Sequence, residues 1–233
     1  MKRKIIALLP LKDNSQRIKG KNFKSMAGKP LFSWILETLL QIESIDFVLI
    51  NTDARKTLED NGLSDSDRVV IKDRPNEIRG DDVSMNLIIE NDISTHDADL
   101  YLMTHTTNPL LSADTIKLAI ELFESSSNID SLFSVNKIQT RFYDEQANPI
   151  NHDPNNLIQT QDLPVWYEEN SCLYIFTKKS FEATSSRIGS SPMIFPIPKT
   201  ESVDIDEIDD WNLAEAMQLI KKKLVKKKLL IVR

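Results

Sequence analysis

Short, continuous apolar runs recur along the chain and alternate with segments of helical periodicity. Runs of this length and character are typical of strands that are buried on both faces of a parallel sheet. We expect strands at Ile5–Leu9, Phe47–Asn51, Val69–Ile71, Leu100–Thr104, Ser131–Val135 and Leu173–Phe176.

The segments between these runs carry the apolar spacing of amphipathic helices. Residues 30–42 begin with a proline at a first-turn position, and residues 112–124 begin with Ser112 as a predicted N-cap. A closing helix is expected from about Glu207, and its predicted apolar face is Leu213, Met217, Ile220 and Leu224. The alternation of strands and helices predicts an α/β fold with a doubly wound, mostly parallel sheet, within one domain over residues 1–233.

Residues 137–170 interrupt this pattern. The segment is polar, contains three prolines and is too long for an ordinary loop of a compact domain. It also carries Phe142, Tyr143, Trp166 and Tyr167, which suit a buried interface or a ligand pocket. We expect an arm that crosses to a second subunit in a homodimer; the alternative is a lid that folds over the chain's own site.

The net charge of −6 is unevenly distributed. The last 13 residues, from Lys221 on, hold six lysines and one arginine, which leaves 22 basic and 35 acidic side chains on the first 220 residues. A body with a net charge of about −13 has little reason to bind nucleic acid. The basic tail predicts the solvated end of the last helix, with an amphipathic membrane contact as the alternative.

A single cysteine, Cys172, excludes an internal disulfide and indicates a reducing, cytoplasmic compartment. No apolar run approaches the ~18 residues that a transmembrane helix needs. The basic and then apolar start is shaped like a secretion signal, but Pro10 and Lys12 interrupt it, so a first buried strand is expected instead.

The segment after the first strand, residues 10–22, is dense in cations and small hydrogen-bonding side chains. Because ligands of open α/β sheets lie beyond the carboxyl ends of the strands, this is where chemistry is expected. The segment matches neither the dinucleotide fingerprint nor a Walker loop. Its composition suits a polyphosphate, and the alternative is a solvated surface turn. The residues concerned are Lys12, Asn14, Ser15, Arg17, Lys19, Lys21 and Asn22.

Two aspartates near the end of the chain, Asp204 and Asp206, are two residues apart in a strand-like alternation with Val203 and Ile205. In extended backbone this spacing puts both carboxylates on one face, where they repel each other unless a cation lies between them. Oxygen ligands and a phosphate partner favour magnesium. The alternative is that these acids only stabilise the start of the closing helix.

Two further residues are weaker candidates. Arg74 follows the third strand and would contact a phosphate or ribose, or pair with an acid such as Glu77. His105 follows the fourth strand and is either a site residue or a structural histidine. The three histidines, at 96, 105 and 152, lack metal-ligand spacing, so no zinc site is expected.

Taken in order, these motifs resemble those of the acylneuraminate cytidylyltransferases and the related 3-deoxy-manno-octulosonate cytidylyltransferases. The similarity runs through residues 7–22, 50–53, 74–82, 104–116, 169–176 and 203–215, which span nearly the whole chain. It implies a nucleotide-diphospho-sugar transferase-like fold and a homodimer with an arm from the later half of the chain. It also implies transfer of CMP from CTP to an acidic sugar, with Mg²⁺ as the cofactor.

The resemblance implies roles for individual residues. The catalytic residues would be Lys12, Lys21 and Asp206, and the magnesium ligands Asp204 and Asp206. The nucleotide would be bound by Leu11, Lys12, Asn14, Ser15, Lys21, Asn22, Arg74, Asp81 and Asn170. The acidic sugar would be bound by His105, Thr106 and Tyr167.

The chain departs from the family pattern toward the sugar end. His105 stands where the family usually has Gln, and Leu111 replaces an Arg. Glu168 and Thr160 lie near positions where arginines are expected, and Met85 replaces a small polar residue. The expected acceptor is a sialic acid-like or other 2-keto-3-deoxy ulosonic acid, and these departures argue against N-acetylneuraminate itself and for a related ulosonic acid or a different acidic acceptor. The alternatives are a same-fold nucleotidyltransferase with another nucleotide or acceptor, such as a phosphonate, and an inactive nucleotide-binding homologue.

Overall fold

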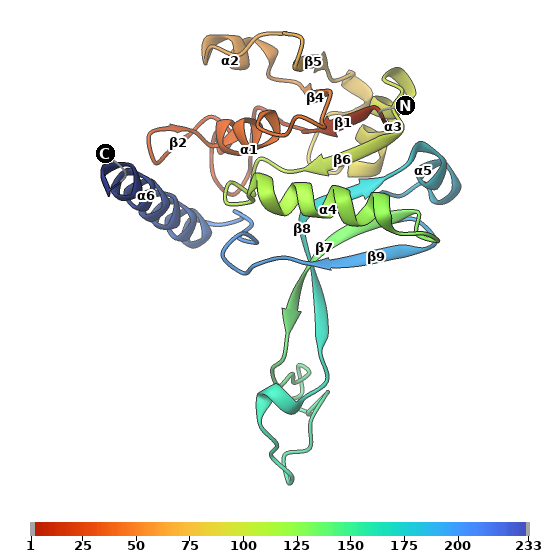
Figure 1. Ribbon diagram of the computed structural model, residues 1–233, viewed down its shortest axis with the longest axis vertical. Helices are drawn as coiled ribbons and strands as arrows, with labels where there is room; N and C mark the ends of the chain where they lie inside the picture. Colours follow the sequence, from red (N-terminus) through yellow and green to blue (C-terminus); the bar gives the residue numbers. More distant parts are fainter. Residues whose placement is uncertain (1–2, 232–233) are drawn as a thin grey trace.

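The computed structural model describes the backbone of residues 3–231 and the side chains of residues 3–224. Its centre is a seven-stranded sheet in the order β5-β4-β1-β6-β8-β7-β9 (Figure 1). The strands are β1 (Ile5–Leu8), β4 (Phe47–Thr52), β5 (Val69–Asp73), β6 (Leu100–Thr104), β7 (Ser131–Ile138), β8 (Trp166–Phe176) and β9 (Pro192–Pro196). A small antiparallel ribbon, β2 (Ser25–Met26) and β3 (Lys29–Pro30), lies outside it.

The predicted doubly wound, mostly parallel α/β sheet is confirmed. Strands β1, β4, β5 and β6 pair in parallel, and β9 pairs in parallel with β7. Strand β8, which contains the predicted run Leu173–Phe176, is antiparallel to both of its neighbours.

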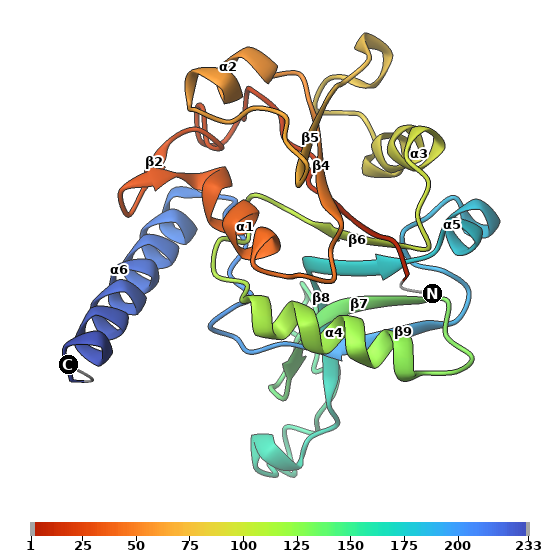
Figure 2. The same cartoon turned by 45° about the horizontal axis from the view of Figure 1, so that its top comes forward.

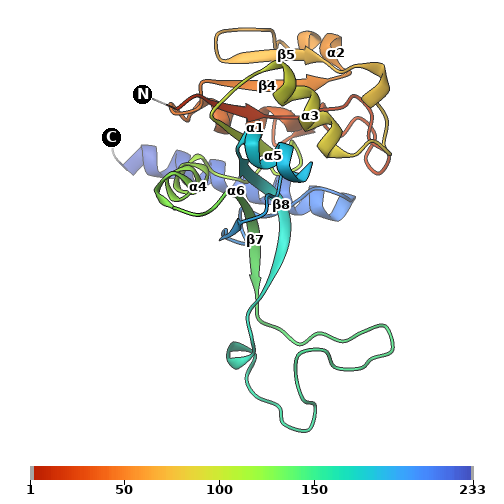
Figure 3. The same cartoon turned by 90° about the vertical axis from the view of Figure 1, so that its right-hand side faces the viewer.

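Helices cover both faces of the sheet. They are α1 (Leu31–Leu40), α2 (Arg55–Asp60), α3 (Met85–Thr95), α4 (Ala113–Ser125), α5 (Lys178–Thr184) and α6 (Ile208–Ile231), with short 3-10 turns at Asn76–Ile78 and Thr160–Asp162. Helices α1, α2 and α4 contribute to one core cluster, and α3 and α5 contribute to the cluster on the opposite face (Figure 3). The central strands β1, β4 and β6 therefore bury both of their faces, which explains why they appear in the sequence as continuous apolar runs. Strand β9, at the edge of the sheet, is largely exposed.

Helix α6 packs beside β2 and α1 rather than on the sheet (Figure 2). Of the four residues predicted for its buried face, Met217 packs against the core, but the prediction was wrong for Leu213, Ile220 and Leu224, which are each more than half exposed. Trp211 and Ala214 are buried instead. Hydrogen bonds set the rotation of α6 about its axis, because side chains of the helix bond to backbone atoms of Ala27, Pro109 and Leu110. The spacing of apolar residues does not reveal which face these bonds turn inward. The side chains that form these bonds are Glu215, Gln218, Lys221 and Lys222.

The lysine-rich tail is described only in part. Lys221 and Lys222 each donate to a backbone carbonyl of the body, so this part of the tail packs against the protein. The side chains from residue 225 on lie outside the described residues. Among the helices that the structure does describe, none has the length and apolar character needed to cross a bilayer.

Strands β7 and β8 continue beyond the sheet as a two-stranded ribbon that projects from the body and ends in an irregular tip (Figure 1). The predicted excursion over residues 137–170 is thus only partly a loop, because the ladder continues to the Ile138–Trp166 pair. Phe142 stacks on Trp166 with ring centroids 5.2 Å apart. Apolar side chains remain exposed along the ribbon and tip: Tyr143, Ile150, Leu157, Ile158, Trp166 and Tyr167.

Candidate active site

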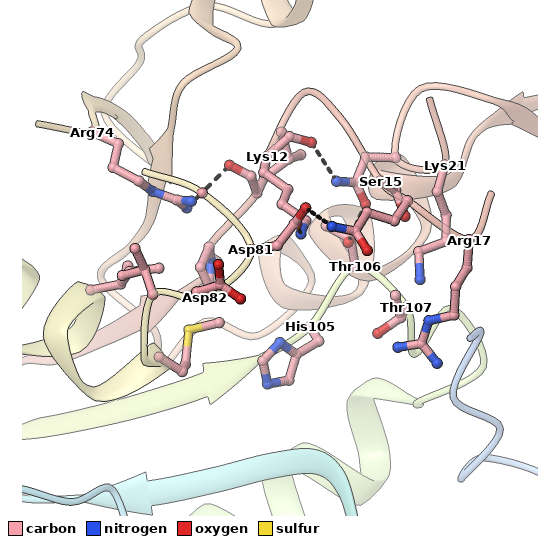
Figure 4. Close-up of a pocket in the computed structure, with 18 residues that line it drawn as sticks. Lys12, Ser15, Arg17, Lys21, Arg74, Asp81, Asp82, His105, Thr106 and Thr107 are labelled. Atoms are coloured by element: carbon pink, nitrogen blue, oxygen red, sulfur yellow. Dashed lines mark hydrogen bonds and ion pairs between the residues drawn. The ribbon is translucent and has the colours of Figure 1, made fainter. Parts of the chain in front are cut away.

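A cavity of about 490 Å³ opens at the carboxyl ends of β1, β5 and β6 (Figure 4). Its walls come from the segment after β1, the segment between β5 and α3, the first turns of α3 and the end of β6. The lining residues are Pro10, Leu11, Lys12, Ser15, Gln16, Arg17, Lys21, Asn22, Arg74, Gly80, Asp81, Asp82, Val83, Met85, Ile88, His105, Thr106 and Thr107. This is the edge of the sheet where ligands of open α/β folds bind.

The segment after β1 is tied to the end of β6 by buried hydrogen bonds. The Asn22 side chain donates to the Lys12 carbonyl oxygen at 2.7 Å and accepts from the Thr106 hydroxyl at 2.6 Å. Gly20 supplies a residue with positive φ, where the chain turns into Lys21 and Asn22. Asn22 and Thr106 therefore hold the shape of this wall as well as lining it.

Lys12 forms an ion pair with Asp81 across the mouth of the cavity. Gln16 also donates to the Asp81 carboxylate, at 2.6 Å. The hydrogen bond from Lys12, followed by the one from Gln16, lowers the pKa of Asp81. Both partners of the pair are partly exposed, so an incoming phosphate has access to the ammonium group.

Lys21 is 8% exposed and donates to the carbonyl oxygen of Ile205, the residue between the two predicted metal ligands. Burial lowers its pKa, and the nearby carboxylates of Asp206 and Asp204 oppose that change. Arg17 lies 2.9 Å from the Asp206 carboxylate in an exposed ion pair. The cationic loop and the acidic segment are thus in contact. Neither sequence pattern by itself predicts that contact.

Asp204 and Asp206 lie just outside the cavity lining, in a segment without regular secondary structure. Ile205 between them is fully buried, so the predicted alternation holds. The Asp204 Oδ1 atom is buried and has no hydrogen-bond partner among the described residues. Burial raises the pKa of Asp204, while a hydrogen bond with Thr107 lowers it.

An unpartnered, buried carboxylate oxygen is costly unless a cation or a proton satisfies it. The pair therefore fits a hard cation such as Mg²⁺. Among the described residues, no group of three or more His, Cys, Asp or Glu side chains gathers to hold a metal. The remaining ligands would have to be phosphate and water oxygens, as is usual for magnesium.

Arg74 is 4% exposed and is held by three hydrogen bonds. It donates to the side chain and the backbone carbonyl of Asn51, both at 2.8 Å, and to the Leu11 carbonyl at 3.2 Å. Asn51 in turn donates to Asp92 at 2.6 Å. Burial lowers the pKa of Arg74, but a guanidinium stays charged at any physiological pH.

Part of the cavity wall consists of apolar and aromatic side chains. Met85 and Ile88 project from α3, and His105 follows β6. Burial, assisted by Arg187 and Lys21, lowers the pKa of His105 to about 3. The imidazole is therefore neutral across the range in which enzymes work.

Six predicted site residues do not line this cavity: Asn14, Lys19, Tyr167, Asn170, Asp204 and Asp206. Asn14 is exposed on the loop, and Tyr167 is exposed on the projecting ribbon. Asn170 is buried within the β7–β8 ladder, where it bonds to Ser134 and Asn136. Lys19 is exposed on the loop, and Asp204 and Asp206 lie beside the cavity. The remaining predicted residues line it: Leu11, Lys12, Ser15, Arg17, Lys21, Asn22, Arg74, Asp81, His105 and Thr106.

Sequence reasoning did not propose several lining residues. Gln16, Thr107, Gly80, Asp82 and Val83 adjoin or lie close to residues that it did propose, and that adjacency was the available signal. Ile88 is on α3, a helix that the periodicity analysis did not predict because its apolar stripe is weak. Arg187 lies in no motif and comes close to the site only in three dimensions.

The chain matches the family model of cytidylyltransferases over residues 6–229. It is 24% identical to the N-acylneuraminate cytidylyltransferase of Escherichia coli over 224 residues, which cover 94% of this chain and 53% of that protein. It is 24% identical to a pseudaminic acid cytidylyltransferase of Campylobacter jejuni, over 92% of this chain and 96% of that protein. It is 25% identical to the CMP-N,N'-diacetyllegionaminic acid synthase of Legionella pneumophila, with the same two coverages. The chain thus spans about half the length of the first relative and nearly all of the other two.

Solved structures show the same fold. A CMP:2-keto-3-deoxy-manno-octonic acid synthetase in complex with CTP superposes with a TM-score of 0.67 at 13% identity, over 94% of this chain and 99% of that one. A 4-diphosphocytidyl-2C-methyl-D-erythritol synthase from Anaerococcus prevotii gives 0.68 at 12% identity, over 93% and 96%. With the family match over nearly its whole length and a cation-lined cavity where the fold binds ligands, this chain belongs to the cytidylyltransferase family.

Proposed function

We propose that this chain transfers CMP from CTP to an acidic sugar of the sialic or ulosonic acid type and releases pyrophosphate. The observation that carries the proposal is the convergence of Lys12, Arg17, Lys21 and Arg74 on one cavity. A cavity with this many cations suits a triphosphate, and the names of the relatives supply the class of acceptor. Membership of the family alone leaves the acceptor open.

In the proposed reaction the anomeric hydroxyl of the sugar attacks the α-phosphorus of CTP. A new oxygen–phosphorus bond forms, the bond to the β-phosphate breaks, and pyrophosphate leaves. Catalysis of such a transfer is mainly positioning and neutralisation of charge. Lys12 and Lys21, which line the cavity, would neutralise the phosphate charge, and buried Arg74, held by hydrogen bonds to Asn51, would orient the nucleotide.

The ion pairs in the site define what the nucleotide must displace. Lys12 is paired with Asp81, and Arg17 with Asp206. Both pairs are partly exposed, and pairs of that kind contribute only about 0–1 kcal/mol each. A phosphate with several negative charges can therefore replace either acid at little cost. Exchange of these pairs would release Asp206 for the cation.

Asp204 and Asp206 are proposed to hold Mg²⁺. The unpartnered Oδ1 atom of Asp204 supports this assignment, because a bound cation would satisfy it. When bound, the metal would withdraw charge from the phosphate oxygens of the nucleotide. Lys21, bonded to the carbonyl between the two aspartates, would set the distance between the metal ligands and the cationic loop.

We also propose that the chain acts as a homodimer in which the β7–β8 ribbon contacts the second subunit. The ribbon and tip expose apolar and aromatic side chains, including Tyr143, Leu157, Trp166 and Tyr167. Exposed surface of this kind is a liability on an isolated chain and is typical of an interface. Light scattering at micromolar concentration tests this, and the expected mass is twice the 26.7 kDa of one chain.

A panel of nucleotides and acceptors tests the catalytic proposal. Pyrophosphate release would be measured with CTP, UTP, GTP and ATP against N-acetylneuraminate, pseudaminic acid, diacetyllegionaminic acid, 2-keto-3-deoxy-manno-octonate and a simple phosphonate. Release with CTP and an acidic sugar is expected. Release only with the phosphonate or with another nucleotide would contradict the proposal, and no release in any combination would indicate an inactive homologue.

A further inference from the structure

Arg187 lies in the connection between α5 and β9 and contacts the cavity wall from behind. Its Nη1 atom is 3.3 Å from the Nε2 atom of His105, across a sequence separation of 82 residues. His105 lines the cavity, whereas Arg187 does not. The contact therefore joins a cavity residue to a cation outside the cavity.

This contact determines which nitrogen of His105 carries the proton. A guanidinium has only donors, so the Nε2 atom that faces it must be the acceptor and must be unprotonated. In a neutral imidazole the proton then resides on Nδ1. Figure 4 shows the ring of His105 with one nitrogen on the side of the cavity that carries Asp82. Since Nε2 faces Arg187, that nitrogen is Nδ1, and it presents an N–H group to the cavity.

Arg187 is itself held in place on several sides. It donates to the Tyr174 hydroxyl at 2.9 Å and lies 3.7 Å above the centre of the Tyr174 ring. It also lies 3.6 Å from the Glu169 carboxylate, which accepts a hydrogen bond from Tyr174. With its side chain 19% exposed and its charge paired, Arg187 has little freedom to turn away from His105.

We propose that Arg187 is a positioning residue for the acceptor: it sets His105 as the neutral tautomer with hydrogen on Nδ1, so that His105 donates to an oxygen of the bound sugar. An acceptor sugar offers hydroxyl, carbonyl and carboxylate oxygens, all of which accept from such a donor. An imidazole with the opposite tautomer would present a lone pair, which repels carbonyl and carboxylate oxygens and leaves only hydroxyl groups able to bond to it, as donors. The inference rests on the proposed function for the identity of the ligand, but the tautomer does not depend on that function.

The first test measures the tautomer by nitrogen-15 NMR of the imidazole side chains in the full-length protein, with His105→Asn to assign the signal among the three histidines. At pH 6 we expect a neutral ring with hydrogen on Nδ1. In Arg187→Met we expect the Nε2–H form or the imidazolium to appear. A wild-type ring protonated on Nε2, or a tautomer that is unchanged in Arg187→Met, would overturn the proposal.

The second test measures kinetics with the acceptor that gives most pyrophosphate in the panel above. Loss of one neutral hydrogen bond should raise the acceptor KM of Arg187→Met about 3- to 10-fold with the CTP KM unchanged. Arg187→Lys keeps the positive charge and a donor and should recover part of the loss. Arg3→Met, at an exposed arginine, is the control for loss of a surface charge. An equal rise in both KM values would indicate a general structural role and would contradict the proposal.

If no acceptor supports turnover, the proposed function fails while the NMR result still decides the role of Arg187. If turnover is normal but the tautomer is wrong, the inference fails while the proposed function stands. The two experiments therefore separate the two claims.

Discussion

Replacing Asp92 with Asn should make the stability of the protein less dependent on pH. Asp92 is on α3, is 1% exposed, and accepts a hydrogen bond from Asn51, which holds Arg74. Burial raises its pKa from the usual 3.8 to about 6, although Asn51, Lys72 and Arg74 favour the charged form. The native state therefore keeps a proton that the unfolded chain releases.

The sign and size of the effect follow from linkage. Between pH 3.8 and about 6 the native state binds more protons at Asp92 than the unfolded state does, so the free energy of unfolding falls as pH rises. The loss amounts to about 3 kcal/mol, at about 1.36 kcal/mol per pH unit. This loss of stability is complete once the pH is well above the native pKa of about 6. Asn at position 92 has a similar shape, can still accept from Asn51, and does not titrate.

The assay is urea unfolding of the wild type and Asp92→Asn at several pH values from 4 to 7.5. The stability of the variant relative to the wild type should rise by about 2–3 kcal/mol across that range. Asp114→Asn, at an exposed aspartate of α4, provides the baseline for loss of a surface carboxylate. A difference between wild type and Asp92→Asn that is the same at every pH would refute the reasoning.

Three further predictions concern the site and the ribbon. Lys21→Ala should weaken CTP binding by at least about tenfold while affecting the sugar less, because one charge-assisted contact contributes about 1.5–3 kcal/mol; an unchanged CTP dissociation constant in a calorimetric titration would argue against its place in the phosphate site. Asp206→Asn should abolish turnover at ordinary magnesium concentrations while circular dichroism shows a native fold, and near-normal activity would remove the metal assignment. Trp166→Ser should shift the mass by light scattering toward 26.7 kDa, since it removes an exposed aromatic ring and its stacking with Phe142; a dimer as stable as the wild type would contradict the role of the ribbon.

The core strands were predictable because a strand that is buried on both faces appears in the sequence as a continuous apolar run. The run Leu100–Thr104 matches β6 at both ends, and Ser131–Val135 begins where β7 begins. The antiparallel direction of β8 was not predictable from its own residues, because direction depends on how the preceding ribbon returns to the sheet. Helix α3 was missed because its apolar residues do not form one clear stripe, and strand β9 because it is short and bounded by Pro192 and Pro196.

The cationic part of the cavity was predictable, and the surroundings of His105 were not. Lys12, Lys21 and Asn22 lie in one short segment, so the fold needs to place only that segment at the sheet edge. The neighbours of His105 come from β8 and from the connection before β9, and no local pattern marks Arg187. The buried face of α6 was mispredicted for a related reason, since hydrogen bonds from residues such as Gln218 set its rotation.

Phosphorus-31 NMR of a reaction of the wild-type protein with CTP, Mg²⁺ and the acidic sugars named above tests the central claim most directly. The proposed function predicts that CTP is consumed with equal amounts of inorganic pyrophosphate and a new phosphodiester, the CMP-sugar. Appearance of CMP without the phosphodiester, or CTP that remains intact with every acidic sugar, would contradict it.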